Sequence, residues 1–229
     1  MRKTVLITGG SEGLGKEVAS VLRNDYNVII LSNHEESLKK SEEELKVPAV
    51  FCDITDPEAI EKSVKEISEI YGGIDILINN AGIWLGGELD SSSYDDIARV
   101  LMVNALGTIY MTKAVLPFMK KKGSGKIINI GSINGVETKT DRSVYIASKW
   151  AVTGFTKAMR KELEKYGIAV IGLQPGLMRT ELHRKAGTER DYTCAMNVKD
   201  VAKVVEFAAS LENIVLEQVV FRNLHCEIF

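Results

Sequence analysis

TVLITGGSEGLG, residues 4–15, joins a run of apolar and β-branched residues to a turn with four glycines. The run predicts a buried strand, and the residues from Leu14 onward have the periodicity of a helix. Glycines in such a turn allow positive φ angles and a close approach of the backbone to a ligand. A helix that begins there offers free N–H groups and the positive end of its dipole to a phosphate. The stretch predicts either a nucleotide-phosphate site or an ordinary glycine-rich turn, and the rest of the chain decides between them.

The spacing of these glycines narrows the class of nucleotide site. It is Gly-x-x-x-Gly-x-Gly, which departs from the Gly-x-Gly-x-x-Gly dinucleotide fingerprint. It also lacks the Gly-Lys-Ser/Thr ending of a P-loop, which argues against a nucleotide triphosphatase.

Short apolar runs alternate with longer helical stretches along the chain, which predicts a doubly wound α/β fold. Strands are expected at 3–8, 27–32, 48–52, 75–79, 126–131, 168–173 and 217–221, and helices at 14–24, 35–45, 57–71, 94–121, 143–165 and 199–210. We therefore expect a Rossmann-like parallel sheet of about seven strands with helices on both faces, in a single domain over residues 1–229. Ligands of such sheets bind beyond the carboxyl ends of the strands.

Composition and charge exclude several classes of partner. The chain has 229 residues, of which 45% are hydrophobic and 26% are charged, and its formal net charge is -2. That balance gives no general attraction to nucleic acid or to an anionic membrane surface. The first apolar run is too short for a signal peptide, and no later run approaches about 18 apolar residues. We expect a cytoplasmic protein without nucleic-acid or membrane partners.

The cysteines and histidines show no metal-site spacing. The three cysteines are odd in number and far apart, which suggests neither a disulfide framework nor a metal site and favours a reducing compartment. The three histidines lie in separate segments, where surface or loop positions are expected. We expect no metal ion. The residues concerned are Cys52, Cys194, Cys226, His34, His183 and His225.

A second pattern, SVYIASKW at residues 143–150, sets Tyr145 and Lys149 one helical turn apart on the same face of a predicted helix. A tyrosine that packs against a lysine stem would explain the pair without any chemistry. A cation beside a phenol also favours phenolate and lowers a pKa that starts near ~10. Ser132 precedes Tyr145 by thirteen residues and follows another predicted strand. Its hydroxyl can therefore converge with the pair at the carboxyl edge of the sheet.

Together the ordered motifs resemble the short-chain dehydrogenase/reductase family. They are the Thr-Gly-x-x-x-Gly-x-Gly turn, NNAG at 79–82, VLMVNALG at 100–107, NIGS at 129–132, Tyr-x-x-x-Lys at 145–149 and PG at 175–176. The resemblance runs from Thr4 to the last predicted strand near Phe221. It implies hydride transfer between a nicotinamide cofactor and a small carbonyl or secondary alcohol. It also implies a catalytic tetrad of Asn104, Ser132, Tyr145 and Lys149.

The chemistry of hydride transfer suits these four residues. Reduction of a carbonyl leaves an alkoxide, which needs a hydrogen-bond donor in place and a proton. Tyr145 would donate the proton and act as base in reverse, with Lys149 lowering its pKa, and Ser132 would hydrogen-bond the substrate oxygen. The resemblance adds that Lys149 holds the nicotinamide ribose and that Asn104 joins a water relay.

The resemblance also implies the cofactor contacts. The phosphate turn comprises Gly9, Ser11, Gly13, Leu14 and Gly15, and the adenine contacts are Asp53 and Ile54. The segment behind the adenine ribose is Asn80, Ala81 and Gly82. The nicotinamide-side contacts are Pro175, Gly176 and Thr180, and Tyr145 and Lys149 of the tetrad contact the ribose.

Cofactor preference depends on the end of the second strand. An NAD-selective enzyme usually has a carboxylate there for the adenine ribose, whereas an NADP-selective one offers donors to the extra phosphate. This chain has Ser32, Asn33 and His34 at that place, and it has Glu12 in the glycine turn, where NADP-preferring relatives often carry a basic residue. We expect a modest preference for NADP, because the missing acid weighs more than Glu12, and NAD remains possible.

Several points stay open. A dinucleotide-sensing regulator on the same fold is the alternative function, and a methyltransferase on a similar sheet is disfavoured because the tetrad has no part in that chemistry. For Trp84 and Leu85 the sequence leaves three roles open: lining a substrate pocket, packing in the core, or forming an oligomer contact. The segment 177–197 takes the place of a variable lid, and its short, polar sequence predicts an open cleft. The helices at 94–121 and 143–165 are expected to pair in a homodimer or homotetramer.

Overall fold

Seven parallel strands form one sheet in the computed structural model, which describes residues 2–224. The sheet order is β3-β2-β1-β4-β5-β6-β7, so the chain starts near the middle and builds outward in both directions. The strands are β1 Thr4–Thr8, β2 Asn27–Ser32, β3 Ala49–Phe51, β4 Ile76–Asn79, β5 Gly125–Ile130, β6 Ile168–Pro175 and β7 Gln218–Phe221. The predicted Rossmann-like sheet is confirmed, and its order reverses direction between β1 and β4, where such folds bind their ligands.

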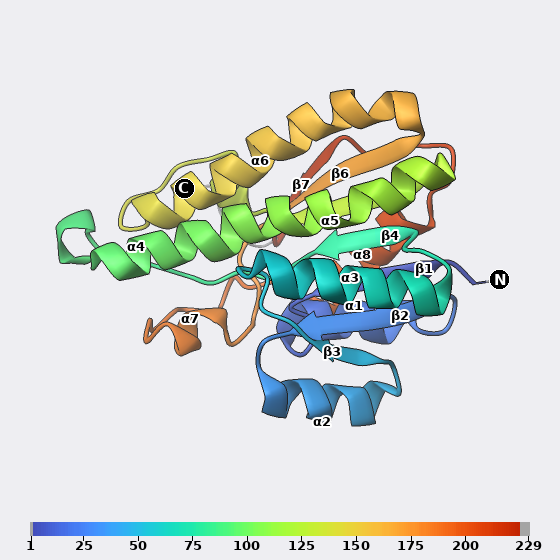
Figure 1. The fold of residues 1–229 in the computed structure, drawn as a ribbon. Helices are drawn as coiled ribbons and strands as arrows, with labels where there is room; N and C mark the ends of the chain where they lie inside the picture. The colour runs from blue at the N-terminus through green and yellow to red at the C-terminus, as the bar shows by residue number, and fades with distance from the viewer. Residues whose placement is uncertain (1, 225–229) are drawn as a thin grey trace.

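Helices cover both faces of the sheet (Figure 1). The helices are α1 Gly13–Leu22, α2 Glu35–Leu45, α3 Pro57–Tyr71, α4 Tyr94–Leu101, α5 Gly107–Lys122, α6 Ser143–Leu163, α7 Leu182–Lys185 and α8 Val198–Ser210. In Figure 1 the arrowheads of the strands point toward the end of the molecule at which α4 and α7 lie. That end is the carboxyl edge, where the predicted site residues should meet.

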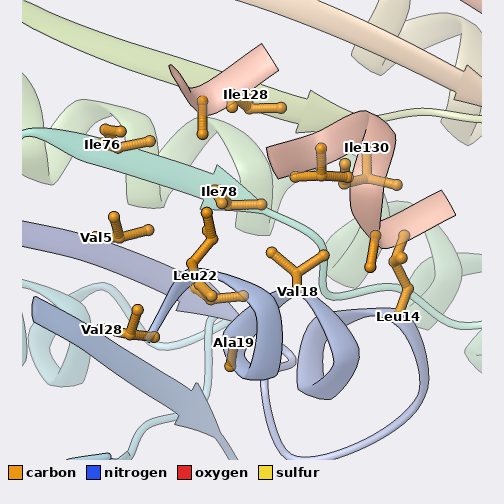
Figure 2. Packing of buried hydrophobic residues seen from close by; sticks show 14 of the residues in the cluster. Val5, Leu14, Val18, Ala19, Leu22, Val28, Ile76, Ile78, Ile128 and Ile130 are labelled. Carbon is orange, nitrogen blue, oxygen red and sulfur yellow. The ribbon is translucent and has the colours of Figure 1, made fainter. Parts of the chain in front are cut away.

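Two apolar layers sandwich the sheet because its strands are buried on both faces. Along β1, Val5 and Ile7 belong to the layer beneath α1 and α8, whereas Leu6 belongs to the layer beneath α3, α5 and α6. Figure 2 shows Val18 and Leu22 of α1 packing against the side chains of the central strands. Side chains that alternate between two cores are the reason these strands read as continuous apolar runs. The central strands are therefore a rigid platform for the loops beyond them.

The predicted helix at 94–121 is interrupted at one place. Between α4 and α5, residues Met102–Leu106 form a π-helical turn that contains Asn104. Single π-turns inside α-helices are frequent at functional sites. Counted through the π-turn, the helical stretch Tyr94–Lys122 is long and apolar enough on average to cross a membrane by length and composition, with 39% of its most apolar window buried. No unbroken run of about 18 apolar residues occurs in it, and the side of α5 that faces the sheet supplies much of its apolar character.

The structure adds detail to the expected lid and changes the interpretation of the cysteines. The expected lid contains a short helix, α7, and Met178 pairs with Met196 across its base, so the lid is a structured flap. Cys52 is a free, buried thiol, whereas Cys194 is disulfide-bonded, and Cys226 lies outside the described residues. The expectation of no disulfide is wrong for Cys194. The cysteine spacing therefore carries no argument about the compartment.

Candidate active site

A cleft of about 900 Å³ opens at the carboxyl edge and collects most of the predicted cofactor residues. Its lining includes Gly9, Ser11, Glu12, Gly13, Leu14, Ser32, Asn33, Asp53, Ile54, Asn80, Ala81, Gly82, Tyr145, Lys149 and Thr180. A smaller cavity adjoins it at the tyrosine and is lined by Ser132, Pro175 and Gly176. Gly15 and Asn104 line neither space; Gly15 packs against the glycine turn, and Asn104 hydrogen-bonds the loop after β4. The structure thus gathers residues from across the chain at one edge of the sheet.

The glycine turn is shaped to admit a phosphate group. Gly9 and Gly13 have φ angles of 63° and 52°, which disfavour any other residue. A Cβ atom at Gly15 would lie 2.2 Å from the carbonyl oxygen of Gly9, so α1 begins pressed against the turn. Glu12, the N-cap of α1, makes no side-chain capping bond. The first N–H groups of α1 therefore stay available to an anion, and the turn fits a pyrophosphate.

The NNAG segment fixes that turn from the neighbouring strand. The Asn80 amide nitrogen donates to the backbone oxygens of Thr8 and Gly9, both at 3.1 Å. The Thr8 hydroxyl accepts from the backbone nitrogens of Asn80 and Ala81 at 3.0 and 3.1 Å. These bonds join the ends of β1 and β4 at the point where the sheet order reverses. The motif therefore supports the cofactor turn by holding its backbone.

The adenosine end of the cleft has a mixed charge. The Ser11 hydroxyl donates to that of Ser32 at 2.9 Å, and the Asn33 amide donates to the Asp53 carboxylate at 2.9 Å. Glu12 forms an ion pair with Lys185 of α7. Burial opposes ionisation of Glu12, but the hydrogen bond and charge of Lys185 and a hydrogen bond from Ser37 together outweigh it and lower the pKa of the carboxyl. The one acid in the glycine turn is therefore matched by a cation from the lid.

Tyr145 and Ser132 meet at the junction of the cleft and the smaller cavity. Both side chains are buried, and they share a side-chain hydrogen bond. Burial raises the pKa of Tyr145 to about 12, and the Ser132 hydrogen bond and the Arg142 charge oppose that rise. The expectation that Lys149 lowers this pKa is not met in the protein alone, because burial disfavours the phenolate more than these groups favour it. The phenol is therefore protonated at neutral pH and poised to donate.

Lys149 lies beside Tyr145 with its charge largely unmatched. Its ammonium is 5.8 Å from the centre of the Tyr145 ring and donates to the backbone oxygen of Ile130 at 3.2 Å. Burial lowers its pKa to about 8. No carboxylate of the described residues forms an ion pair with it. An ammonium with two donors to spare at the cleft wall fits the hydroxyls of a ribose.

Asn104 holds the segment that leads from NNAG to the pocket. Its amide nitrogen donates to the Ile83 oxygen and the Ser148 hydroxyl, both at 3.0 Å, and its amide oxygen accepts from the Ile83 nitrogen at 2.8 Å. The π-turn carries this side chain between α6 and the loop after β4. With these bonds made, Asn104 positions the loop backbone next to Trp84.

Gln174 is a site residue that the sequence analysis missed. Its side-chain oxygen accepts from the Ser132 backbone nitrogen at 2.7 Å, and its side-chain nitrogen donates to the Thr153 hydroxyl at 3.3 Å. It is buried at the end of β6, directly before Pro175. The sequence signal that could have identified it is a glutamine in an otherwise apolar predicted strand, directly before the Pro175–Gly176 motif. It fixes the loop that presents Ser132.

The wall opposite the cofactor turn is aromatic and cationic. The Trp84 ring lies 4.6 Å, centre to centre, from both the Tyr145 and the His183 rings. The guanidinium carbons of Arg142 and Arg190 lie over the Trp84 ring at 5.4 and 5.7 Å. Trp84 is therefore a pocket residue, which decides a question that the sequence left open. His183 is buried, so the expectation of a surface or loop histidine is wrong for it.

Known proteins resemble this chain in sequence and in fold. The model of the short chain dehydrogenase family matches residues 3–191. The chain is 34% identical to an NADP-dependent 3-hydroxy acid dehydrogenase of Schizosaccharomyces pombe, covering 93% of this chain and 90% of the relative. It is 38% identical to a 3-ketodihydrosphingosine reductase of Bacteroides thetaiotaomicron, covering 77% and 64%. A solved structure described as ElxO with NADP bound superposes with a TM-score of 0.86 at 33% identity, covering 96% of each chain. This chain belongs to the short-chain dehydrogenase family of oxidoreductases.

Proposed function

We propose that the protein transfers a hydride between NADP(H) and a carbonyl or secondary alcohol, with Tyr145 as the acid in reduction and the base in oxidation. The observation that carries the proposal is the buried Tyr145–Ser132 pair beside Lys149, at the point where the dinucleotide-sized cleft meets the smaller cavity. The nicotinamide cofactor supplies or accepts the hydride. The remaining steps are proton transfers and hydrogen bonds made by this chain.

Each of the three side chains has one task. Ser132 donates to the substrate oxygen and aligns the carbonyl, since Gln174 fixes its backbone. Tyr145 delivers its proton to the developing alkoxide, and its raised pKa keeps that proton in place until then. Lys149 binds the ribose hydroxyls and places a positive charge near the phenolate left behind. Burial of all three strengthens these interactions by excluding water.

The preference for NADP draws on the adenosine end of the cleft. Ser32 offers a hydroxyl where an NAD-selective enzyme would have an acid, Asn33 covers the Asp53 carboxylate with a hydrogen bond, and Lys185 offsets the charge of Glu12. A 2′-phosphate therefore meets little net repulsion there. NADP is also the cofactor in the name of the Schizosaccharomyces pombe relative and in the ElxO structure. NAD remains the alternative cofactor.

A turnover assay tests the proposal. The purified protein is mixed with NADPH or NADH and a panel of ketones, aldehydes, oxo acids and oxo esters, and the loss of nicotinamide absorbance is followed. We expect turnover of at least one carbonyl, with a higher kcat/KM for NADPH. Tight NADPH binding without turnover of any carbonyl would contradict the proposal and favour a dinucleotide-sensing regulator. A clear advantage for NADH would overturn the cofactor preference alone.

We also propose that two copies pair through α4, α5 and α6. α4 lies against α6. These two helices expose Tyr94, Leu101 and Trp150, and the π-turn after α4 exposes Met102. Such apolar side chains gain stability when a second copy covers them. Light scattering at micromolar concentration should give a dimer or tetramer, and Trp150→Glu should weaken it, whereas a wild-type monomer would contradict the pairing. The cytoplasmic location, the single-domain limits and the lack of nucleic-acid and membrane partners stay predictions.

A further inference from the structure

The cavity beside Tyr145 has an unusual charge for a space lined by buried aromatic rings. Its volume is about 110 Å³, and its cations are Lys139, Arg142 and Arg190. None of its lining residues is an aspartate or glutamate. Arg142 comes from the start of α6 and Arg190 from the lid segment, so two separate parts of the chain bring positive charge to the same cavity.

The two arginines approach the same ring. Both guanidinium carbons lie within 6 Å of the centre of the Trp84 ring, which itself touches Tyr145. The Arg190 charge acts unfavourably on Arg142, and an anion beside the two guanidinium groups would offset that repulsion. Cation–π contacts with Trp84 recover only part of that cost.

Neighbouring acids do not neutralise these arginines. Among the described residues, neither forms an ion pair, and the one hydrogen bond from the Arg142 guanidinium goes to the Thr140 backbone oxygen at 3.1 Å. Asp141 is adjacent to Arg142 in sequence and favours its charge without pairing with it. Glu189 and Asp191 flank Arg190 in the sequence, but neither forms an ion pair with it among the described residues, and the Asp191 carboxylate accepts hydrogen bonds from Thr193. The positive potential of the cavity is therefore left for a ligand.

The effect of this potential is visible at two neighbouring groups. Burial lowers the pKa of Arg142, and the Arg190 charge lowers it further. Burial together with the Arg190 and Arg142 charges lowers the pKa of His183 to about 4. His183 is thus neutral at physiological pH and does not add to the charge. Its ring lies against Trp84, which joins the lid to the loop after β4, and its Nδ1 atom is 3.3 Å from the Tyr192 hydroxyl within the lid itself.

We propose that the cavity binds a carboxylate of the substrate, so that the reacting compound is a short oxo acid or the corresponding hydroxy acid, held by Arg142 and Arg190. This inference rests on the proposed function, because it assigns the other end of the same substrate. A guanidinium donates two parallel hydrogen bonds to a carboxylate and suits a partly dry site better than an ammonium does. The small cavity favours a carboxylate close to the carbonyl over a long acyl chain. Lys139, which is exposed, attracts the anion from the mouth of the cavity.

Matched substrates separate charge from shape. 2-Oxobutanoate and 3-oxobutanoate are compared with their amides, and hydroxyacetone phosphate with hydroxyacetone, using NADPH and the wild-type protein. We expect kcat/KM for the better oxo acid to exceed that for its amide by roughly 10-fold or more, as charge-assisted hydrogen bonds contribute. Equal or better use of the amides would overturn the inference while leaving the proposed function intact. A phosphate preferred over both acids would overturn the carboxylate assignment.

Single substitutions locate the carboxylate. Arg190→Gln and Arg142→Gln should each lower kcat/KM for the oxo acid by roughly 10-fold or more, mostly through KM, and change that for the amide by less than about 2-fold. Arg184→Gln is the matched control, because Arg184 lies in α7, is exposed and lines neither space. Equal losses for acid and amide would show that the arginines serve only to hold the lid, which contradicts the inference.

A binding measurement covers the case in which no carbonyl is turned over, which would refute the proposed function alone. In a Trp150→Phe background, Trp84 is the sole tryptophan. With saturating NADP⁺ present, 2-oxobutanoate or 3-oxobutanoate should change the Trp84 fluorescence in a saturable way. The amides should not do so at the same concentrations, and Arg190→Gln should weaken the response. A folded protein whose Trp84 fluorescence responds to neither acid would overturn the inference.

Discussion

The two sides of the cleft are built by different means. On the cofactor side, backbone atoms do most of the work: the glycine turn, the start of α1 and the bonds from Asn80 and Thr8 fix main-chain groups in place. On the substrate side, side chains from the loop after β4, the start of α6 and the lid meet around Trp84. A site built from backbone atoms requires particular main-chain angles and close contacts, whereas a site built from side chains depends on which residues the loops carry. Changes on the two sides should therefore fail in different ways.

The largest effect is expected from a methyl group at the glycine turn. In Gly15→Ala the new Cβ would lie 2.2 Å from the Gly9 oxygen and 2.5 Å from the Asn80 amide nitrogen, so the turn must move. We expect a loss of stability of about 1–3 kcal/mol and loss of measurable NADPH binding. Thermal unfolding and NADPH fluorescence titration measure the two. Gly154→Ala in α6, where a Cβ meets nothing within 4 Å, is the control and should stabilise slightly.

A smaller effect, confined to the substrate side, is expected from Trp84→Ala. The change removes the ring that contacts both Tyr145 and His183, so kcat/KM for the carbonyl should fall roughly 10- to 100-fold. The Kd for NADPH should stay within about 2-fold, and Trp84→Phe should restore most of the activity because it keeps an aromatic ring. If Trp84→Ala weakened NADPH binding by the same factor as kcat/KM, the cofactor side and the substrate side would not be separate.

Lys149 lies where the two sides of the cleft meet, and its burial should make the free energy of unfolding depend on pH. Its folded pKa of about 8 lies below the unfolded value of 10.5. Between those values the unfolded chain binds more protons, so this group adds stability as pH rises from 8 to 10.5 and imposes its full penalty below pH 8. We expect Lys149→Met to raise the unfolding free energy by roughly 1–2 kcal/mol at pH 7, with a smaller gain near pH 10.

Lys126 provides the matched control for that measurement. Burial also lowers its pKa to about 8, but its ammonium donates to the backbone oxygens of Ala208, Ala209 and Leu211 at the end of α8. Lys126→Met should destabilise the protein, because it leaves those oxygens without a donor. If both substitutions changed stability in the same direction, the description of Lys149 as an unmatched buried charge would be wrong.

The smallest effect concerns the contact between the lid and the glycine turn. Lys185→Ala removes the cation that pairs with Glu12, and the pair is partly exposed, so the change should be modest. We expect the Kd for NADPH to rise about 2- to 5-fold and that for NADH to change less, because both cofactors bring a pyrophosphate to the turn but only NADPH adds a 2′-phosphate on the side of the freed carboxylate. Glu12→Gln should reverse the effect. Lys203→Ala, which breaks an exposed pair on α8, is the control. An equal change for both cofactors would remove Glu12 from cofactor selection.

The same contrast explains what the sequence could predict. The glycine turn, NNAG and the Tyr145–Lys149 pair are local patterns with strict spacing, so the cofactor side could be predicted from the sequence. The strands are continuous apolar runs, so the fold could be predicted as well. Trp84, His183 and Arg190 are brought together by tertiary packing of separate loops, and no local pattern marks that meeting. The raised pKa of Tyr145 was also out of reach, because it depends on burial rather than on the four-residue spacing.

The central claim is that the buried phenol of Tyr145 is the proton donor, and Tyr145→Phe tests it most directly. The substitution keeps the ring that packs on Trp84 and removes only the hydroxyl. NADPH titration and NADPH-dependent turnover of the best carbonyl are measured on the same preparation. We expect the Kd for NADPH to stay within about 2-fold and kcat to fall by roughly 10²- to 10⁴-fold, the range of a general acid. Turnover near the wild-type rate would contradict the assignment of Tyr145 as the acid.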